Sequence, residues 1–498
     1  MLFWFVIIYW AISVGIGLYA STKVHNTKDF AIAGRHLPFY MVTATVFATW
    51  FGSETVLGIP ATFLQGGLGS VVSDPFGSSM CLILVGLFFA APLYRMNLLT
   101  IGDFYKRRFG RSVEVITTLA IVISYLGWVG AQITALGLVF NVVSDGSISK
   151  LAGMWIGSGT ILIYTVYGGM WAVAVTDFLQ MIIIVIGMLW IGGEVSGMVG
   201  GVGVVIEHAS AAGKFNFWPD MDLKSVLAFT AAWITMMFGS IPQQDVFQRV
   251  QSSKTEKIAV WGSVLGGSLY FLFAFIPMFL AYSATLLEPE MVAGLIDTDP
   301  QMILPRLVLE KAPLIAQIMF FGALLSAIKS CASATLLAPS VTFTENILRP
   351  ALAHKFSDKQ LLLAMRIVTV TFTILVTLYA VNSKASIFKM VENAYQVTLV
   401  SAFIPLTAGL FWKRATHQGA LLSIFAGIVV WLSILLSGIE DPLIPAQLAG
   451  VVAAFFGMLI GSLAPQWIRW TPPHEDDGHA ALHHHAAAET HHTSSASQ

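Results

Sequence analysis

The sequence predicts an all-α membrane protein with thirteen transmembrane helices. Hydrophobic residues make up 56% of the 498 residues and charged residues only 11%, and the mean hydropathy is +0.77. A soluble protein carries about 25% charged residues. The apolar segments each span or nearly span a hydrocarbon core of about 30 Å. They are residues 1–20, 38–63, 75–94, 113–142, 153–168, 170–196, 226–248, 258–284, 314–340, 361–381, 387–411, 418–437 and 445–466.

The first segment, 1–20, has no basic residues before it, so we read it as a retained helix rather than a cleaved signal. Most Lys and Arg residues fall on one side of the predicted spans, and the densest cluster is 106–111. The positive-inside rule then places the N-terminus outside and the C-terminus in the cytoplasm. We expect a plasma-membrane protein in contact with lipid, as a monomer or a homo-oligomer. No basic cluster suits nucleic acid.

The segment 38–63 is long enough to cross a bilayer, but its centre is poor for an uninterrupted helix. Gly52, Glu54 and Pro60 lie there, and a carboxylate at membrane depth is costly. Residues 238–244 form a second interrupted stretch. A kinked helix and a helix end would explain each separately. Two interrupted helices in corresponding halves instead indicate a transporter's binding site.

The charged residues Glu54, Asp177 and Lys329 fall inside predicted spans and call for an explanation. Glu54 fits either a solute contact or a satisfied packing acid, and Asp177 either a cation stop or an interfacial acid. Lys329 lies near the middle of its span, where its amine cannot reach water, so we expect a carboxylate partner. The candidates are Glu54, Asp177 and Glu392. The small polar residues of 327–335 suit close helix packing and also a hard cation.

Trp50 and Trp128 also lie in the middle of spans, away from the interfaces where tryptophan usually anchors. An indole face can hold an organic cation, although packing alone would also explain a buried ring. Gln132 follows Trp128 by one helical turn and shares its face. The tail 471–498 carries scattered histidines. We expect it to be disordered, although metal binding remains an alternative.

These features resemble the sodium/solute symporter family across about residues 1–466. The strongest matches are 48–60, 168–180, 326–346 and 409–414. The resemblance implies a LeuT-type fold with two inverted five-helix repeats, at about 38–196 and 226–411. The chain would then divide into a first helix and loop (1–37), a transport core (38–411), two C-terminal helices (412–470) and the tail.

The same resemblance implies a site for Na⁺, the only cofactor-like ion we expect. Backbone carbonyls would come from Ala48, Phe51 and Ala327, and side chains from Ser330 and Cys331. Cysteine is a poor ligand for a hard cation.

Asp177 matches the family position associated with cation passage, and Thr55, Gln243 and Glu392 match positions that face the solute. In the high-affinity choline transporter branch, Trp50 and Trp128 match the aromatic cage, whereas Ser78 and Gln243 replace a tyrosine and a tryptophan.

We therefore expect a secondary active symporter that uses the sodium gradient to take up a small polar organic solute, such as an amino acid, a quaternary amine or a carboxylate. An alternative keeps the fold but replaces the ion by Lys329, which gives sodium-independent or proton-coupled transport. A second alternative is a solute sensor. No nucleophile and base or metal-ligand set lies in the spans, so we do not expect an enzyme.

Overall fold

The computed structural model describes residues 2–352, 357–439 and 441–468, and within these ranges the chain is helical. The α-helices are α1 (Leu2–Ala20), α2 (Thr27–Ile32), α3 (Phe39–Trp50), α4 (Ile59–Gly66), α5 (Ser78–Leu84), α6 (Ala90–Arg95), α7 (Ile101–Phe109), α8 (Arg111–Val143), α9 (Lys150–Met198), α10 (Val202–Ala211), α11 (Leu223–Gly239), α12 (Gln244–Ser252), α13 (Glu256–Leu287), α14 (Pro289–Leu295), α15 (Ile303–Lys311), α16 (Leu314–Phe343), α17 (Arg349–Ala351), α18 (Asp358–Asn382), α19 (Ile387–Thr398), α20 (Ile404–Phe411), α21 (His417–Leu436) and α22 (Ala446–Leu463). The π-helical turns are η3 (Glu54–Gly58), η5 (Val72–Gly77), η6 (Val85–Phe89), η8 (Thr344–Leu348) and η9 (Leu399–Phe403). The tail 471–498 lies outside the described residues.

Short polar side chains set where several long helices begin. Ser149, Thr255 and Thr416 each accept a hydrogen bond from a backbone N–H of the first turn of α9, α13 and α21. Such caps satisfy donors that have no partner within the helix. At α7 the cap is reciprocal. The Thr100 side chain accepts a hydrogen bond from the backbone N–H of Asp103, and the Asp103 side chain accepts one from the backbone N–H of Thr100.

Ten helical stretches of the described chain are long and apolar enough to cross a membrane, or eleven if the bent pair α11 and α12 counts as one. This number is lower than the thirteen segments of the sequence for two reasons. The segments 153–168 and 170–196 are assigned as one helix, α9, interrupted at Gly169 (φ 48°, ψ −145°). The segment 38–63 is divided into α3, η3 and α4, none of which is long enough alone.

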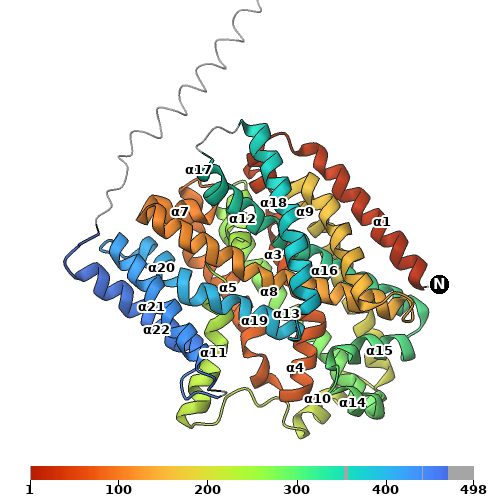
Figure 1. Ribbon diagram of the computed structural model, residues 1–498. Coiled ribbons are helices and arrows are strands. Elements are labelled where there is room, and N and C mark those ends of the chain that lie inside the picture. Colours follow the sequence, from red (N-terminus) through yellow and green to blue (C-terminus); the bar gives the residue numbers. More distant parts are fainter. Residues whose placement is uncertain (1, 353–356, 440, 469–498) are drawn as a thin grey trace, which may run out of the picture.

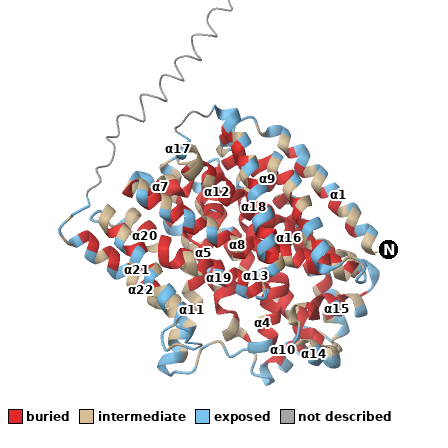
Figure 2. Cartoon of the chain, in the orientation of Figure 1, coloured by how far each residue is buried: buried red, intermediate tan, exposed pale blue. Residues whose placement is uncertain are grey.

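The helix α16 lies in the middle of the bundle, where it packs against α1, α3, α8 and α9. Nearly all of its residues from 320 to 342 are buried, as Figure 2 shows for the centre of the molecule. In Figure 1, α1 lies at one edge, and α21 and α22 lie at the opposite edge. The polar side chains of α16 therefore lie at the centre of the bundle, away from lipid.

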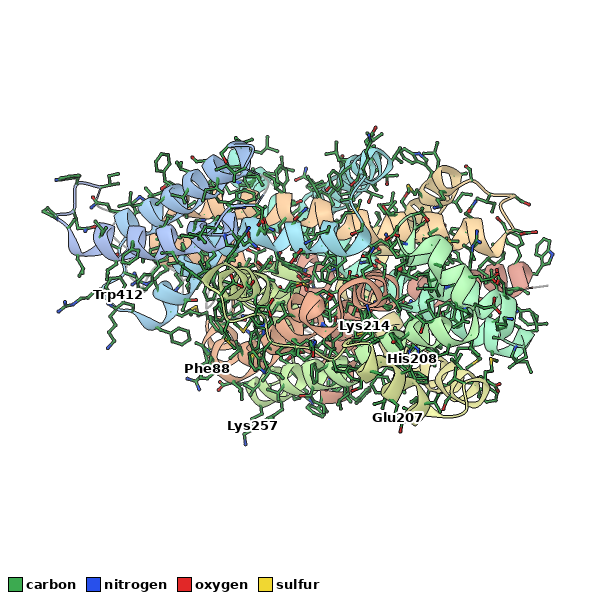
Figure 3. All side chains as sticks on the ribbon, turned by 90° about the horizontal axis from the view of Figure 1, so that it is seen from below. Phe88, Glu207, His208, Lys214, Lys257 and Trp412 are labelled. Atoms are coloured by element: carbon green, nitrogen blue, oxygen red, sulfur yellow. The ribbon has the colours of Figure 1, made fainter. Side chains whose placement is uncertain are left out.

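The periphery is apolar, as lipid contact requires. Phe88 and Phe425 are 56% and 66% exposed, and Figure 3 shows Phe88 at the rim of the bundle. Charged side chains such as Lys257 and Glu207 project outward in the same view. Large exposed apolar surface is unusual for a soluble monomer and normal for a membrane span.

Candidate functional site

The helix α3 stops in the middle of the bundle, at the break that the sequence predicts. Phe51 leaves helical geometry (φ −84°, ψ 74°). The next N–H, that of Gly52, donates to Trp50 O at 3.0 Å. In a continuous helix it would donate to Ala48 O. The break therefore takes Ala48 O out of the helical hydrogen-bond ladder.

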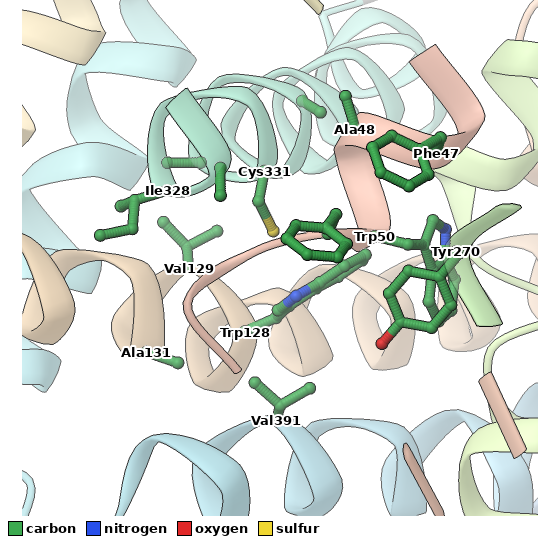
Figure 4. Close-up of a cluster of buried hydrophobic side chains, with 14 of the residues drawn as sticks. Phe47, Ala48, Trp50, Trp128, Val129, Ala131, Tyr270, Ile328, Cys331 and Val391 are labelled. Carbon is green, nitrogen blue, oxygen red and sulfur yellow. The ribbon is translucent and has the colours of Figure 1, made fainter. Parts of the chain in front are cut away.

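The break faces α16 at close range. A Cβ atom on Gly52 would lie 2.9 Å from Cys331 Sγ and 2.7 Å from Glu54 Oε2. Contacts this short are not tolerated, so a residue with a side chain would force the side chain of Cys331 or Glu54 to move. Figure 4 shows Cys331 pointing from α16 toward the broken segment that follows Ala48. The structure thus brings the broken helix and the 327–335 region together, as expected.

All five predicted sodium ligands are fully buried. They are Ala48, Phe51, Ala327, Ser330 and Cys331. Ser330 Oγ donates to Asp177 Oδ1 at 2.6 Å, and Thr45 Oγ1 donates to the other oxygen of the same carboxyl group. Asp177 of α9 is therefore placed directly beside the predicted ligands. This arrangement joins the predicted cation-passage residue to the predicted ion site through Ser330.

Three aromatic rings from three helices meet beside the break. The ring centroids of Trp50 and Trp128 are 5.3 Å apart, those of Trp128 and Tyr395 are 5.4 Å apart, and those of Trp50 and Tyr395 are 5.9 Å apart. Tyr395, of α19, was not singled out from the sequence. An isolated tyrosine in an apolar segment carries no signal that it joins two tryptophans from other helices.

Glu54 is the polar centre of this region and is 2% exposed. Its carboxylate accepts hydrogen bonds from Trp128 Nε1 at 3.2 Å and from Gln132 Nε2 at 2.7 Å. Gln132 Oε1 in turn accepts from Ser53 N at 2.9 Å. The helical spacing of Trp128 and Gln132 therefore predicted their shared face correctly, and both side chains fix the same carboxylate.

A second buried carboxyl group, that of Asp74, extends the polar region toward α13. It accepts hydrogen bonds from Ser78 and from Tyr270. The Tyr270 hydroxyl lies 3.3 Å from Thr55 Oγ1, and Thr55 Oγ1 also donates to Trp50 O at 3.2 Å. Ser78 and Thr55 are thus linked through Asp74 and Tyr270, which the sequence alone does not mark as site residues. The sequence signal for Asp74 was an acid at the start of an apolar segment.

Gln243 and Glu392, the other two predicted solute contacts, have partners of their own. Gln243 Nε2 donates to Ser124 Oγ at 2.9 Å. Glu392 pairs with Lys389 on the same helix at 2.5 Å. Both side chains are buried, at 1% and 6% exposure, and their role at the solute stays a prediction.

Beneath the break, α12 is buried along its whole length although it is highly polar. Arg249 donates to Thr49 Oγ1 at 2.8 Å and to Asp245 O at 3.0 Å. Its guanidinium also acts electrostatically on Asp177 and Asp245. In the sequence, Arg249 directly follows the apolar segment 226–248, and nothing there indicates that its side chain is buried.

The expectation that Lys329 pairs with Glu54, Asp177 or Glu392 is wrong. Its ammonium donates to Ser13 Oγ at 2.6 Å. It also lies 4.6 Å from the ring centroid of Trp10 and 5.4 Å from that of Tyr164. An aromatic environment of this kind stabilises a cation without a carboxylate. The side chain therefore turns toward α1 and α9.

A bundle of apolar helices, with two interrupted helices and a buried polar centre beside the interruption, defines a secondary transporter. Residues 30–427 match the sodium:solute symporter family, and the chain belongs to it. The protein is a symporter that couples Na⁺ to the movement of a solute. The alternative driver, Lys329 in place of the ion, is not favoured.

The chain is similar to the high affinity choline transporter 1 of Homo sapiens, at 26% identity over 446 residues, which cover 85% of this chain and 75% of that protein. It is similar to the sodium/glucose cotransporter of Vibrio parahaemolyticus, at 25% identity over 455 residues and with 84% and 82% covered. A Na⁺-coupled sialic acid symporter, solved in a substrate-bound outward-open state, shares the fold with a TM-score of 0.81 at 19% identity, over 95% of this chain and 99% of that one.

Proposed function

We propose that Na⁺ binds between the break after α3 and α16, where Ala48, Phe51, Ala327 and Ser330 supply oxygen atoms. The observation that carries this proposal is the hydrogen bond from Gly52 N to Trp50 O, which frees the Ala48 carbonyl beside α16. Carbonyl and hydroxyl oxygens suit a hard cation, whereas the Cys331 thiol contributes little. Ion binding here would hold α3 against α16.

The solute site lies on the other side of the same break. Trp50 and Trp128 provide apolar faces, and Glu54, Thr55 and Gln132 provide polar contacts. Ser78, Gln243 and Glu392 are the remaining residues that we place in contact with the solute. This composition favours a small solute with a polar or charged group, such as an amino acid, a quaternary amine or a carboxylate.

Transport follows from the sharing of one broken helix by two ligands. Na⁺ at α16 fixes the backbone of 48–53 and thereby orders Trp50 and Glu54 for the solute. Inward release of the ion proceeds past Asp177, once Arg249 moves away from Thr49. Two ligands that stabilise the same arrangement of a segment bind cooperatively.

The membrane arrangement that fits this proposal has thirteen crossings in the plasma membrane, with the N-terminus outside. The crossings comprise the ten helical stretches, the bent pair, the broken segment 38–63 and the second half of α9. The transport core would be 38–411, preceded by 1–37 and followed by 412–470.

The sodium site is tested on purified protein by thermal unfolding in NaCl and in KCl at equal ionic strength. A ligand that binds only the folded state raises the unfolding temperature. We expect a saturable rise with Na⁺ that K⁺ does not produce and that Ser330→Ala weakens. An equal response to both salts would contradict the proposal.

A further inference from the structure

The carboxylate of Glu54 has no positively charged partner within the described part of the chain. It accepts hydrogen bonds from the neutral N–H groups of Trp128 and Gln132. Asp74 acts on it electrostatically as a second negative group. Among the described residues, no basic side chain lies within ion-pair distance of either acid. A buried carboxylate of this kind is costly until a proton or a cationic ligand neutralises it.

The protein's own buried cations are engaged elsewhere. Arg249 is bonded to Thr49 and to Asp245 O, and Lys329 is bonded to Ser13. No side chain of the described residues supplies a positive charge to Glu54, so a proton or a cationic ligand must neutralise it.

The surroundings of Glu54 favour an organic cation over a second metal ion. Trp128 holds the carboxylate at the edge of its indole ring, and the rings of Trp50 and Tyr395 lie against that indole. Aromatic faces bind an ammonium group that has been stripped of water. A small metal ion would instead need several further oxygen atoms.

One more group indicates what kind of ammonium fits. The hydroxyl of Tyr395 is fully buried and has no hydrogen-bond partner within the described chain. The ring centroid of Tyr395 lies 5.4 Å from that of Trp128, whose Nε1 donates to Glu54. Asp245 and Glu54 both act electrostatically on this side chain, Asp245 more strongly. A hydroxyl and a carboxylate both have free lone pairs for an N–H donor. A quaternary ammonium has no N–H and would leave both unused.

We propose that the solute is a protonated amine that carries at least one N–H, which it donates to Glu54 while its charge lies against Trp50, Trp128 and Tyr395. This inference rests on the proposed solute site and narrows it, since it excludes carboxylates and disfavours quaternary amines.

The test compares four small probes in thermal unfolding of the purified protein in NaCl: ethanolamine, its trimethylated form choline, neutral ethylene glycol and anionic glycolate. We expect ethanolamine to bind at least tenfold more tightly than choline and the other two to have no effect. Tighter binding of choline, binding of glycolate or ethylene glycol, or no response to any amine while Na⁺ alone stabilises the protein would each overturn the inference.

Variants separate this inference from the sodium site. Glu54→Gln keeps the size of the side chain and should abolish the ethanolamine response but keep the response to Na⁺ alone. Tyr395→Phe should weaken ethanolamine severalfold and leave choline unchanged. The control Glu290→Gln removes an exposed acid from α14 and should change neither response. Ethanolamine binding that is unaltered in Glu54→Gln would contradict the role of Glu54. If Glu54→Gln instead lost its response to Na⁺ and kept its response to ethanolamine, the result would contradict the sodium site.

Discussion

Arg249 donates a hydrogen bond of 2.8 Å to Thr49 Oγ1 and thereby joins α12 to the last turn of α3. A second bond, to Asp245 O at 3.0 Å, anchors the guanidinium to its own helix. Asp177 is affected electrostatically by the same guanidinium. Arg249 thus acts electrostatically on both Asp177 and Asp245, and its hydrogen bond to Thr49 connects α12 to α3 next to the break.

Arg249→Met should destabilise the protein because it removes the hydrogen bonds to Thr49 and to Asp245 O, together with a positive charge that acts on Asp177 and Asp245. A buried hydrogen-bonding group that loses its partner costs about 1–3 kcal/mol, and a charged group costs more. Thermal unfolding measures the loss, and Arg306→Met, at an exposed arginine of α15, serves as the control. The double variant with Asp177→Asn should lose less than the sum of the single variants. Additive losses would show that the two groups are independent.

Cys331→Ser should strengthen Na⁺ binding, because a hydroxyl oxygen replaces a sulfur beside the proposed ion. We expect about a tenfold lower Na⁺ concentration at half effect, equivalent to about 1.4 kcal/mol. The Na⁺ dependence of thermal unfolding provides the measurement. Cys81→Ser, at the other buried cysteine, is the matched control. Equal effects of both substitutions would place the ion away from α16.

The sequence identified the break and its chemistry because the signals are local. Gly52 and Glu54 within one apolar segment predict an interrupted helix, and the spacing of Trp128 and Gln132 places both on one face. Contacts between distant segments leave no such pattern. Tyr395 reaches the site from another helix.

Lys329 shows the same limit. A charge inside a span predicts a partner, but the sequence cannot show that aromatic rings from α1 and α9 take the place of a carboxylate. The expected count of thirteen spans also used only length and hydropathy, whereas the helices of the structure are joined at Gly169 and divided at Phe51.

Lys329→Met should leave Na⁺-dependent behaviour intact, because the ammonium contacts Ser13, Trp10 and Tyr164 rather than the predicted sodium ligands. Methionine fills the same space without a charge, and the loss of a desolvated cation–π contact of about 2 kcal/mol is offset by the removed desolvation cost. The unfolding temperature and its rise with Na⁺ should both remain close to those of the parent protein. Loss of the Na⁺ response in this variant would restore Lys329 as part of the ion site.

A second cluster ties α7 to η8 around Asn346, whose side chain donates to Asp103 Oδ1 and to Glu114 Oε1, each at 2.9 Å. Its Oδ1 accepts from Thr100 Oγ1 at 2.7 Å. A Cβ atom on Gly102 would lie 2.5 Å from this amide.

Gly102→Ala should therefore destabilise the protein by displacing Asn346 from its three partners, with a loss of about 2–4 kcal/mol. Asn346→Ala removes the amide group, and with it both the three hydrogen bonds and the obstruction. Gly102→Ala should therefore cost much less stability in that background. The free energies from thermal or denaturant unfolding of the two single variants and the double variant form a closed cycle. The control Gly294→Ala lies in open space on α14 and should have little effect. If Gly102→Ala costs the same with and without Asn346, the obstruction arises from the backbone of η8 rather than from the amide.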